Sequence, residues 1–355
     1  MLKHVIHKWE RKLSRVDTNR MLLPFEWGLE FLDRDLRQSD SDAGSARDTL
    51  FRFNDSVLAD SDSFFSAAPI REYSFDGHWV SFASSVQSPY PENNTAYGRY
   101  FPVAKRGDSG RRAAQDEVEL AQGRAVIVLP QWNADVDGHV GLCRWLNHDG
   151  IAAVRLSLPY HHSRMPSGLK RADYLVSPNV GRTLQACRQA VLDVRGMVDW
   201  LIERGYRRIG ITGTSIGSCI AFLAMIHDAR LKAGAYNHVS SYFGDVVWEG
   251  ISTAHVRRGL ESALTREEVR RAWLAISPNA YIRRFAGDGR AGLFISARYD
   301  LSFPPELSQL LFEECDRHGV RYDLRRVPWG HYTMGKTPFK YYDGYMIVSY
   351  LRKRI

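Results

Sequence analysis

The chain of 355 residues is 44% hydrophobic and contains 28 glycines, so it can bury a substantial core and is not disordered throughout. Its formal net charge of +8 is spread along the chain rather than gathered in one basic tract, which argues against nucleic acid as a partner. The four cysteines lie far apart without a CxxC pair, so we expect no zinc site, no dense disulfide framework and a reducing, cytoplasmic compartment.

Residues 1–16 place apolar side chains at helical spacing among several Lys and Arg residues, which predicts a basic amphipathic helix. Charges every few positions exclude a secretory h-region and a transmembrane span here, so we expect a soluble protein. The helix is expected to pack onto the body of the protein. The alternatives are peripheral contact with a membrane surface and an organellar transit segment.

Residues 38–64 are rich in Ser and Asp and have few clustered apolar residues, as in a surface connection or a mobile insertion. We therefore predict that residues 1–70 form a helical extension and a polar linker. Residues 71–355 are then expected to form the main domain.

The main domain begins with short strands over residues 72–84 and 95–103, as expected for the antiparallel edge of a sheet. Strands then alternate with helices, and each strand–helix–strand unit implies a parallel crossover. The predicted segments are strand 125–130, helix 138–150, strand 151–159, helix 181–204, strand 208–213, helix 216–227 and strand 233–241. This order predicts a doubly wound α/β fold with a mostly parallel sheet.

Residues 244–290 interrupt the alternation, because they are helical and amphipathic where a simple crossover would need fewer residues. We predict a helical cap inserted at this point. The alternation then resumes with strand 291–300, helix 305–319, strand 322–331 and a last helix from about residue 339 to 352.

Residues 213–217 read Gly-Thr-Ser-Ile-Gly between an apolar strand and an apolar helix. In this setting the serine occupies a sharp turn, and side chains in place of the two glycines would collide with the neighbouring strand and helix. An incidental serine in a Gly-rich turn is the alternative interpretation. We predict Ser215 as a nucleophile at a helix N-terminus, where anionic intermediates are favoured.

A serine hydroxyl needs a nearby base, and the base needs an acid to orient it. Asp300 and His331 each follow a predicted strand, so the order Ser, Asp, His puts all three at the carboxyl ends of parallel strands. A surface aspartate and a turn-capping histidine are the plainer alternatives. Asp245 and Glu249 are the reserve candidates for the acid.

From about residue 95 onward the chain resembles the alpha/beta-hydrolase superfamily, with GTSIG, SARYD and WGH at the nucleophile, acid and histidine positions. VDWLIERGYRRIGITGTSIG resembles alpha/beta-hydrolase-domain esterases of bacteria and their eukaryotic relatives, and LSLPYHHSRMP is similar to a loop of those proteins. The resemblance implies esterase, lipase or related acyl-hydrolase chemistry without a cofactor. Ser218 replaces a glycine that many relatives carry, which bears on how closely this helix packs on the strand.

The oxyanion formed at a substrate carbonyl needs backbone N–H donors. The N–H of Ile216 is expected to be one of them. The superfamily's loop after the strand at 125–130 implies Trp132 as the second donor, with Gln131 adjacent, and both could instead be ordinary loop residues lining the pocket.

His161 and His162 suggest a metal site, but adjacent side chains point in different directions and no third ligand accompanies them, so we expect none. We expect His161 and His162 to cap the strand end near the pocket mouth, with Arg164 available to hold an acidic group. Three aromatic residues of the cap either line an acyl pocket or are packing residues, and packing is the favoured interpretation. They are Trp248, Trp273 and Tyr281.

The sequence favours a serine hydrolase that cleaves a small-molecule or lipid-like carboxylic ester through an acyl-enzyme on Ser215. The same fold also serves amide and peptide hydrolases and acyltransferases. A catalytically silent binding protein is the third interpretation. The sequence does not indicate an oligomeric state.

Overall fold

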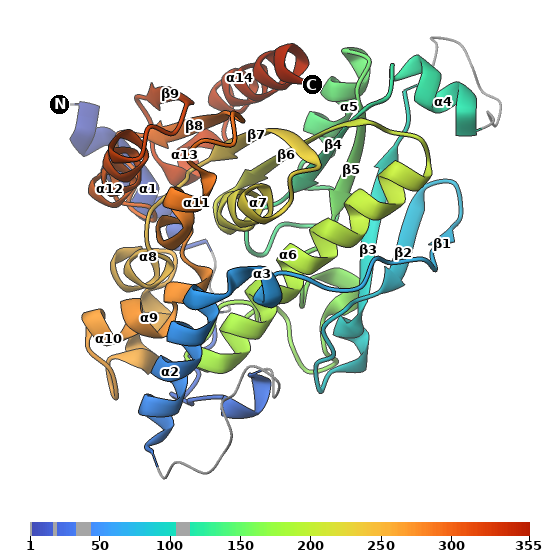
Figure 1. Ribbon diagram of the computed structural model, residues 1–355. Coiled ribbons are helices and arrows are strands. Elements are labelled where there is room, and N and C mark those ends of the chain that lie inside the picture. The colour runs from blue at the N-terminus through green and yellow to red at the C-terminus, as the bar shows by residue number, and fades with distance from the viewer. Residues whose placement is uncertain (1, 17–19, 33–43, 104–113) are drawn as a thin grey trace.

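A mixed sheet between two layers of helices forms the centre of the computed structural model, which describes residues 2–16, 20–32, 44–103 and 114–355 (Figure 1). The strands are β1 (Ser74–Phe75), β2 (Trp79–Ala83), β3 (Thr95–Phe101), β4 (Arg124–Leu129), β5 (Ala152–Leu156), β6 (Arg208–Thr214), β7 (Leu231–Asn237), β8 (Gly292–Ala297) and β9 (Tyr322–Val327). Their order in the sheet is β1-β2-β3-β5-β4-β6-β7-β8-β9. The pairs from β1 through β3 to β5 are antiparallel and those from β5 to β9 are parallel, which confirms the predicted doubly wound, mostly parallel sheet.

The central strands are mostly apolar, as expected where helices cover both faces of a sheet. Along β4, Ile127 points into the larger core cluster while Val126 and Val128 point into a second cluster on the opposite face. The helices that alternate with the strands are α4 (Ala114–Leu120), α5 (Val140–His148), α6 (Val180–Glu203), α7 (Ile216–His227), α12 (Pro305–Arg317) and α14 (Phe339–Arg354). Helices α6, α7 and α12 contribute to the larger cluster, and α5 and α14 to the second one.

The segment between β7 and β8 forms the predicted helical insertion. It contains α8 (Phe243–Glu249), α9 (Ala254–Leu260), α10 (Arg266–Ala272), α11 (Ile282–Phe285) and two 3-10 turns, η4 (Leu274–Ile276) and η5 (Pro278–Tyr281). Trp273 is fully buried and its indole N–H donates to Val180 O, while the Tyr281 hydroxyl donates to Ala275 O. Both aromatic residues therefore have the packing role that the sequence favours.

The segments before β1 are α1 (Leu2–Ser14), η1 (Leu29–Phe31), α2 (Ala46–Ala59) and α3 (Ser61–Phe64). The prediction of a polar linker is wrong over residues 46–64, because Leu50, Phe53 and Val57 of α2 are buried in the main core. The Asn54 side chain is also buried, and it bonds Ala272 O and Ala275 N of the cap. Residues 38–43 of that prediction lie outside the described residues.

Helix α1 packs onto the body of the protein through Ile6, Glu10 and Ser14, as the favoured interpretation of residues 1–16 expects. The remaining short elements are η2 (Pro91–Asn94), η3 (His162–Arg164) and α13 (His331–Met334). In the ranges that the structure describes, we find no helix with the length and apolar character needed to cross a bilayer.

Candidate active site

Ser215 lies in the turn between β6 and α7, with φ 59° and ψ −124°. The backbone of Ser215 is therefore strained. The chain segments on either side of Ser215 also lie close together, since a Cβ on Gly213 would strike the backbone of Gly217. A Cβ on Gly217 would lie 2.5 Å from Pro130 O, in the segment that follows β4. The Ser218 hydroxyl, which is fully buried, donates to Ser215 O over 2.7 Å. The turn is thus held against β4 by glycine and tied to α7 by Ser218.

Three side chains from separate strand ends meet at this turn. Ser215 Oγ lies 3.1 Å from His331 Nε2, and His331 Nδ1 lies 3.0 Å from Asp300 Oδ2. An ionised carboxylate only accepts hydrogen bonds, so His331 Nδ1 carries a proton and its Nε2 can accept the serine proton. The strands β6, β8 and β9 deliver these residues to one edge of the sheet, because they are parallel members of the same sheet.

Asp300 is 3% exposed and fully engaged. Its Oδ1 accepts the backbone N–H groups of Ser302 (2.8 Å) and Phe303 (2.7 Å). Burial acts to raise the pKa of Asp300, but the neighbouring His331 and His238 outweigh burial and hold that pKa well below its usual range. Asp300 is therefore an ionised acceptor beside His331.

The imidazole of His331 is largely buried, with 12% of its side chain exposed. Burial acts to lower its pKa, whereas the carboxylates of Asp300 and Glu10 act to raise it. The net effect raises the pKa of His331 above its ordinary value of 6.5. The protonated form of His331 is therefore more favoured than in a free histidine.

His238 is a fourth member of the cluster that sequence reasoning missed. Its Nδ1 lies 2.7 Å from Asp300 Oδ2, although its N–H does not point along this contact, and its ring lies 4.1 Å from the ring of His331. Burial lowers the pKa of His238, so the neutral form is favoured. His238 directly follows β7 in a left-handed conformation with φ 58°, so the reasoning from strand ends that identified Asp300 could have found it.

By spacing, His238, Asp300 and His331 could also hold a metal ion, since their ligand atoms lie within 4.8 Å of one another. His331 and Asp300 are, however, already joined by a hydrogen bond that leads to Ser215.

The two reserve candidates for the acid lie in the cap and not beside His331. Asp245 is buried against Arg270 and Arg266 in the cap, and Glu249 also pairs with Arg266.

The loop after β4 lies directly against Ser215's turn, since a Cβ added at Gly217 would come within 2.5 Å of Pro130 O. Among the described residues, no acceptor is bonded to the backbone N–H of Gln131 or Trp132. The Trp132 indole N–H donates to Ala172 O over 2.8 Å and its ring stacks on His255. Ile216 is the first residue of α7, where backbone N–H groups have no partner within the helix. The predicted oxyanion donors are therefore close to one another in the fold and unused.

The histidine doublet holds this loop. His161 is buried, its Nδ1 donates to Pro159 O and its Nε2 accepts the Asn133 N–H, both over 2.9 Å. Burial lowers the pKa of His161 to about 3, so the ring is neutral and acts as a fixed acceptor. His162 Nε2 bonds Ala134 O on the same loop. Both ring nitrogens of His161 bind backbone, which agrees with the predicted capping role, and its place near a pocket mouth stays a prediction.

The structure contradicts the prediction that Arg164 is available for an acidic group. Its side chain is fully buried, pairs with Asp193 at 2.8 Å and donates to Asn93 O and Ser157 O, so it is not available to an acidic group of a ligand. Trp248 lies half-buried on α8, with the Arg257 guanidinium 5.1 Å from its ring centre. A role for Trp248 in the substrate pocket stays a prediction.

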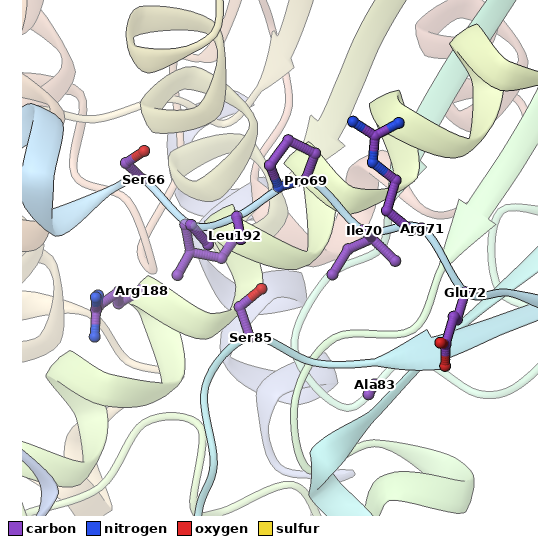
Figure 2. A pocket seen from close by; sticks show the side chains of 11 residues that line it. Ser66, Pro69, Ile70, Arg71, Glu72, Ala83, Ser85, Arg188 and Leu192 are labelled. Carbon is purple, nitrogen blue, oxygen red and sulfur yellow. The ribbon is translucent and has the colours of Figure 1, made fainter.

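A hollow of about 610 Å³ lies away from these residues, between the segment after α3, the end of β2 and helix α6 (Figure 2). Pro69 and Ile70 line it on one side, with Leu192 and Arg188 of α6 on another. Neither Ser215 nor His331 contributes to its walls. It is therefore a surface feature separate from the candidate active site.

No family model matches the sequence, and no curated protein matches it at a significant level. The structure is similar to acetyl xylan esterase 1 from Thermoanaerobacterium sp. JW/SL YS485, with 12% identity over 90% of this chain and 98% of that chain and a TM-score of 0.57. It is also similar to the Pyrococcus horikoshii acylaminoacyl peptidase, with 13% identity, 74% of this chain, 40% of that chain and a TM-score of 0.54. A puromycin-hydrolyzing peptidase of Mycobacterium tuberculosis matches at 11% identity over 81% and 49% of the two chains, with a TM-score of 0.54.

This chain spans less than half the length of each of those two peptidases. At such low identities the matches establish the fold alone. The chain has the alpha/beta-hydrolase fold that its sequence motifs predict.

Proposed function

We propose that this chain is a serine hydrolase that cleaves a carboxylic ester, with Ser215 as nucleophile, His331 as base and Asp300 as the acid that orients it. One observation carries the proposal. An unbroken series of contacts runs from Ser215 Oγ to His331 Nε2 at 3.1 Å and from His331 Nδ1 to Asp300 Oδ2 at 3.0 Å. This is the geometry that a general base needs to remove a hydroxyl proton.

In the proposed reaction His331 Nε2 takes the Ser215 proton as Oγ forms a bond to the ester carbonyl carbon. The tetrahedral intermediate collapses, the bond to the leaving oxygen breaks and His331 returns the proton to the alcohol. Water then attacks the acyl-enzyme with His331 again as base, which releases the acid and regenerates Ser215. Asp300 stays ionised throughout and stabilises the imidazolium, with His238 beside it as a positioning residue.

We assign stabilisation of the negative charge on the carbonyl oxygen to the backbone N–H groups of Ile216 and Trp132, with Gln131 as the adjacent alternative. Their unused donors and their position on the two segments that meet at Gly217 support this assignment. A preformed donor of this kind contributes about 3 to 4 kcal/mol to the transition state by mutational precedent. His161 keeps the loop in place through the Asn133 N–H.

We favour an ester over an amide as the proposed substrate, because the acetyl xylan esterase matches over nearly its whole length, whereas the peptidases match over less than half of theirs. This likeness supports the ester substrate only through overall architecture. Amide hydrolysis, acyl transfer and a silent binding role are the other outcomes of the test below.

The test is labelling with a fluorophosphonate probe, which reacts with activated serines. The wild-type chain should label, Ser215→Ala should not, and Ser66→Ala, which changes an exposed serine beside the hollow of Figure 2, should label normally. p-Nitrophenyl esters of increasing acyl length and matched p-nitroanilides then separate ester from amide cleavage and small from lipid-like substrates. A folded wild-type chain that neither labels nor turns over any of these would contradict the proposal.

A further inference from the structure

We propose that Glu10 of helix α1 is a positioning residue for His331, so that the first helix of the chain is a working part of the active site. The proposal rests on the proposed function of Ser215 and His331. It adds a residue that lies more than 300 positions away in the sequence, and Figure 1 shows α1 beside α13, the short helix that His331 begins.

Glu10 is fully buried although it is a carboxylate, which calls for compensating partners. Its Oε2 accepts the backbone N–H of Tyr332 at 3.0 Å and its Oε1 accepts that of Thr333 at 2.7 Å. These are the second and third residues of α13, whose first residue is His331. Unpaired N–H groups in the first turn of a helix are normally satisfied by a side chain at the N-cap.

The N-cap residue of α13 is Gly330, which has no side chain to serve as a cap. A Cβ on Gly330 would lie 2.5 Å from Glu10 Cδ and 2.6 Å from Glu10 Cγ. The backbone of Gly330 is extended, so its φ does not require glycine. Glycine at this position leaves the space that the Glu10 side chain fills, and Glu10 supplies the cap that glycine lacks.

Further contacts hold α1 against the same region. The Arg20 guanidinium donates to Ser14 O at the end of α1 and to the Tyr332 hydroxyl, and it also reaches Ile251 O in the cap insertion. His7 packs edge-on against Tyr299, the neighbour of Asp300. The α1 segment therefore contacts the residue that precedes the acid and the residues that follow the histidine.

The contact also has an electrostatic consequence. Asp300 and Glu10 act on the pKa of His331, and His238 and His331 interact electrostatically. Asp300 and His331 act in turn on the pKa of Glu10. The guanidinium of Arg20 faces the same region through the Tyr332 hydroxyl. Burial raises the pKa of Glu10, whereas the backbone N–H groups of Tyr332 and Thr333 act to lower it. Both of these contacts come from N–H donors, which an ionised carboxylate accepts. A negative charge here favours the protonated form of His331, and removing it should lower the pKa of that histidine.

The experiment compares the full-length wild type with Glu10→Gln, Glu10→Asp and Ile6→Ala, using p-nitrophenyl butyrate and the fluorophosphonate probe. Gln keeps the volume but removes the charge and one acceptor, whereas Ile6 is a buried apolar residue of the same face of α1. For Glu10→Gln we expect kcat to fall about tenfold with a nearly unchanged KM, since misplacement by about 1 Å can cost 10²-fold. The acid limb of kcat/KM should move to lower pH. Glu10→Asp keeps the charge, so it should lose kcat while its acid limb stays in place.

Ile6→Ala measures the purely structural contribution of α1, so it should lower Tm and leave the acid limb and the labelling rate of the folded fraction unchanged. If Glu10→Gln behaves in the same way as Ile6→Ala, the inference is wrong. If Glu10→Gln does not fold, Glu10→Asp decides, because wild-type kcat in this variant overturns the inference. A wild-type chain that fails to label would instead contradict the proposed function itself.

Discussion

Substitution of Gly217 by alanine is the most direct test of the turn that carries Ser215. The new Cβ would lie 2.5 Å from Pro130 O and 2.6 Å from Leu129 O, which are backbone atoms that cannot rotate away. The start of α7 or the loop after β4 must therefore move by about 0.5 Å or more to relieve the contact. Overpacking of this kind costs roughly 1–3 kcal/mol, against which alanine in a helix recovers up to about 1 kcal/mol.

The movement would fall between the two segments that carry the proposed oxyanion donors, Ile216 on one side and Gln131 and Trp132 on the other. Loss of one such donor reduces kcat by about 10²- to 10³-fold, so we expect Gly217→Ala to lose about 10²-fold in esterase activity. The loss in stability should be small by comparison, so the variant should still fold.

The matched control is Gly141→Ala in α5, where an added Cβ meets nothing within 4 Å. This change should leave activity unaltered and raise stability by up to about 1 kcal/mol. Initial rates with p-nitrophenyl butyrate, rates of fluorophosphonate labelling and thermal unfolding by circular dichroism provide the comparison. Wild-type labelling rates in Gly217→Ala would refute both the steric reasoning and the position assigned to the oxyanion loop.

Three further predictions concern the residues that act on Ser215. Asp300→Asn should lower kcat by about 10⁴-fold because the amide no longer selects the His331 tautomer with a proton on Nδ1, and esterase assays at saturating substrate check this. His238→Phe keeps an aromatic ring but removes the contact with Asp300 at 2.7 Å, so kcat/KM should fall severalfold while thermal unfolding shows a folded protein; an unchanged kcat/KM would dismiss His238 as a positioning residue. Only neutral His331 can act as base, so kcat/KM should rise with pH through a pKa above 6.5, and a limb below that value would contradict the opposing effects of burial and Asp300.

The parts of the fold that the sequence predicts well include its continuous apolar segments. The helix predicted at residues 216–227 is observed as Ile216–His227, and the strand predicted at 208–213 is β6, Arg208–Thr214. Both are mainly apolar and buried, and their lengths of 12 and 7 residues distinguish the helix from the strand. Helix α2 shows the opposite case, since its buried Leu50, Phe53 and Val57 are interleaved with Ser, Asp and Asn that resemble a linker. Composition misled there because it averages over the two faces of a helix.

The candidate site was predictable where position in the sheet determines proximity. Ser215, Asp300 and His331 follow parallel strands of one sheet, so they must come to the same edge, and the structure brings them together. The surroundings followed no such rule. Arg164 was expected to be available to an acidic group, yet its burial and its pairing with Asp193 on α6 are set by tertiary packing that a single strand end does not reveal.

Glu10 shows how far this limit extends. A search for a hydrophobic stripe assigns Glu10 to the solvated face of α1, but Ile6, Glu10 and Ser14 follow one another at intervals of four residues and share the buried face. A buried carboxylate on that face needs hydrogen-bond donors from the part of the protein that it packs against. Here the donors are backbone N–H groups, which occur throughout every chain and therefore leave no signal in the sequence. The one side-chain signal is an absence, the missing Cβ of Gly330 directly before His331. Positioning residues that act through backbone therefore have to be found in the structure, even when the reacting side chains can be found in the sequence.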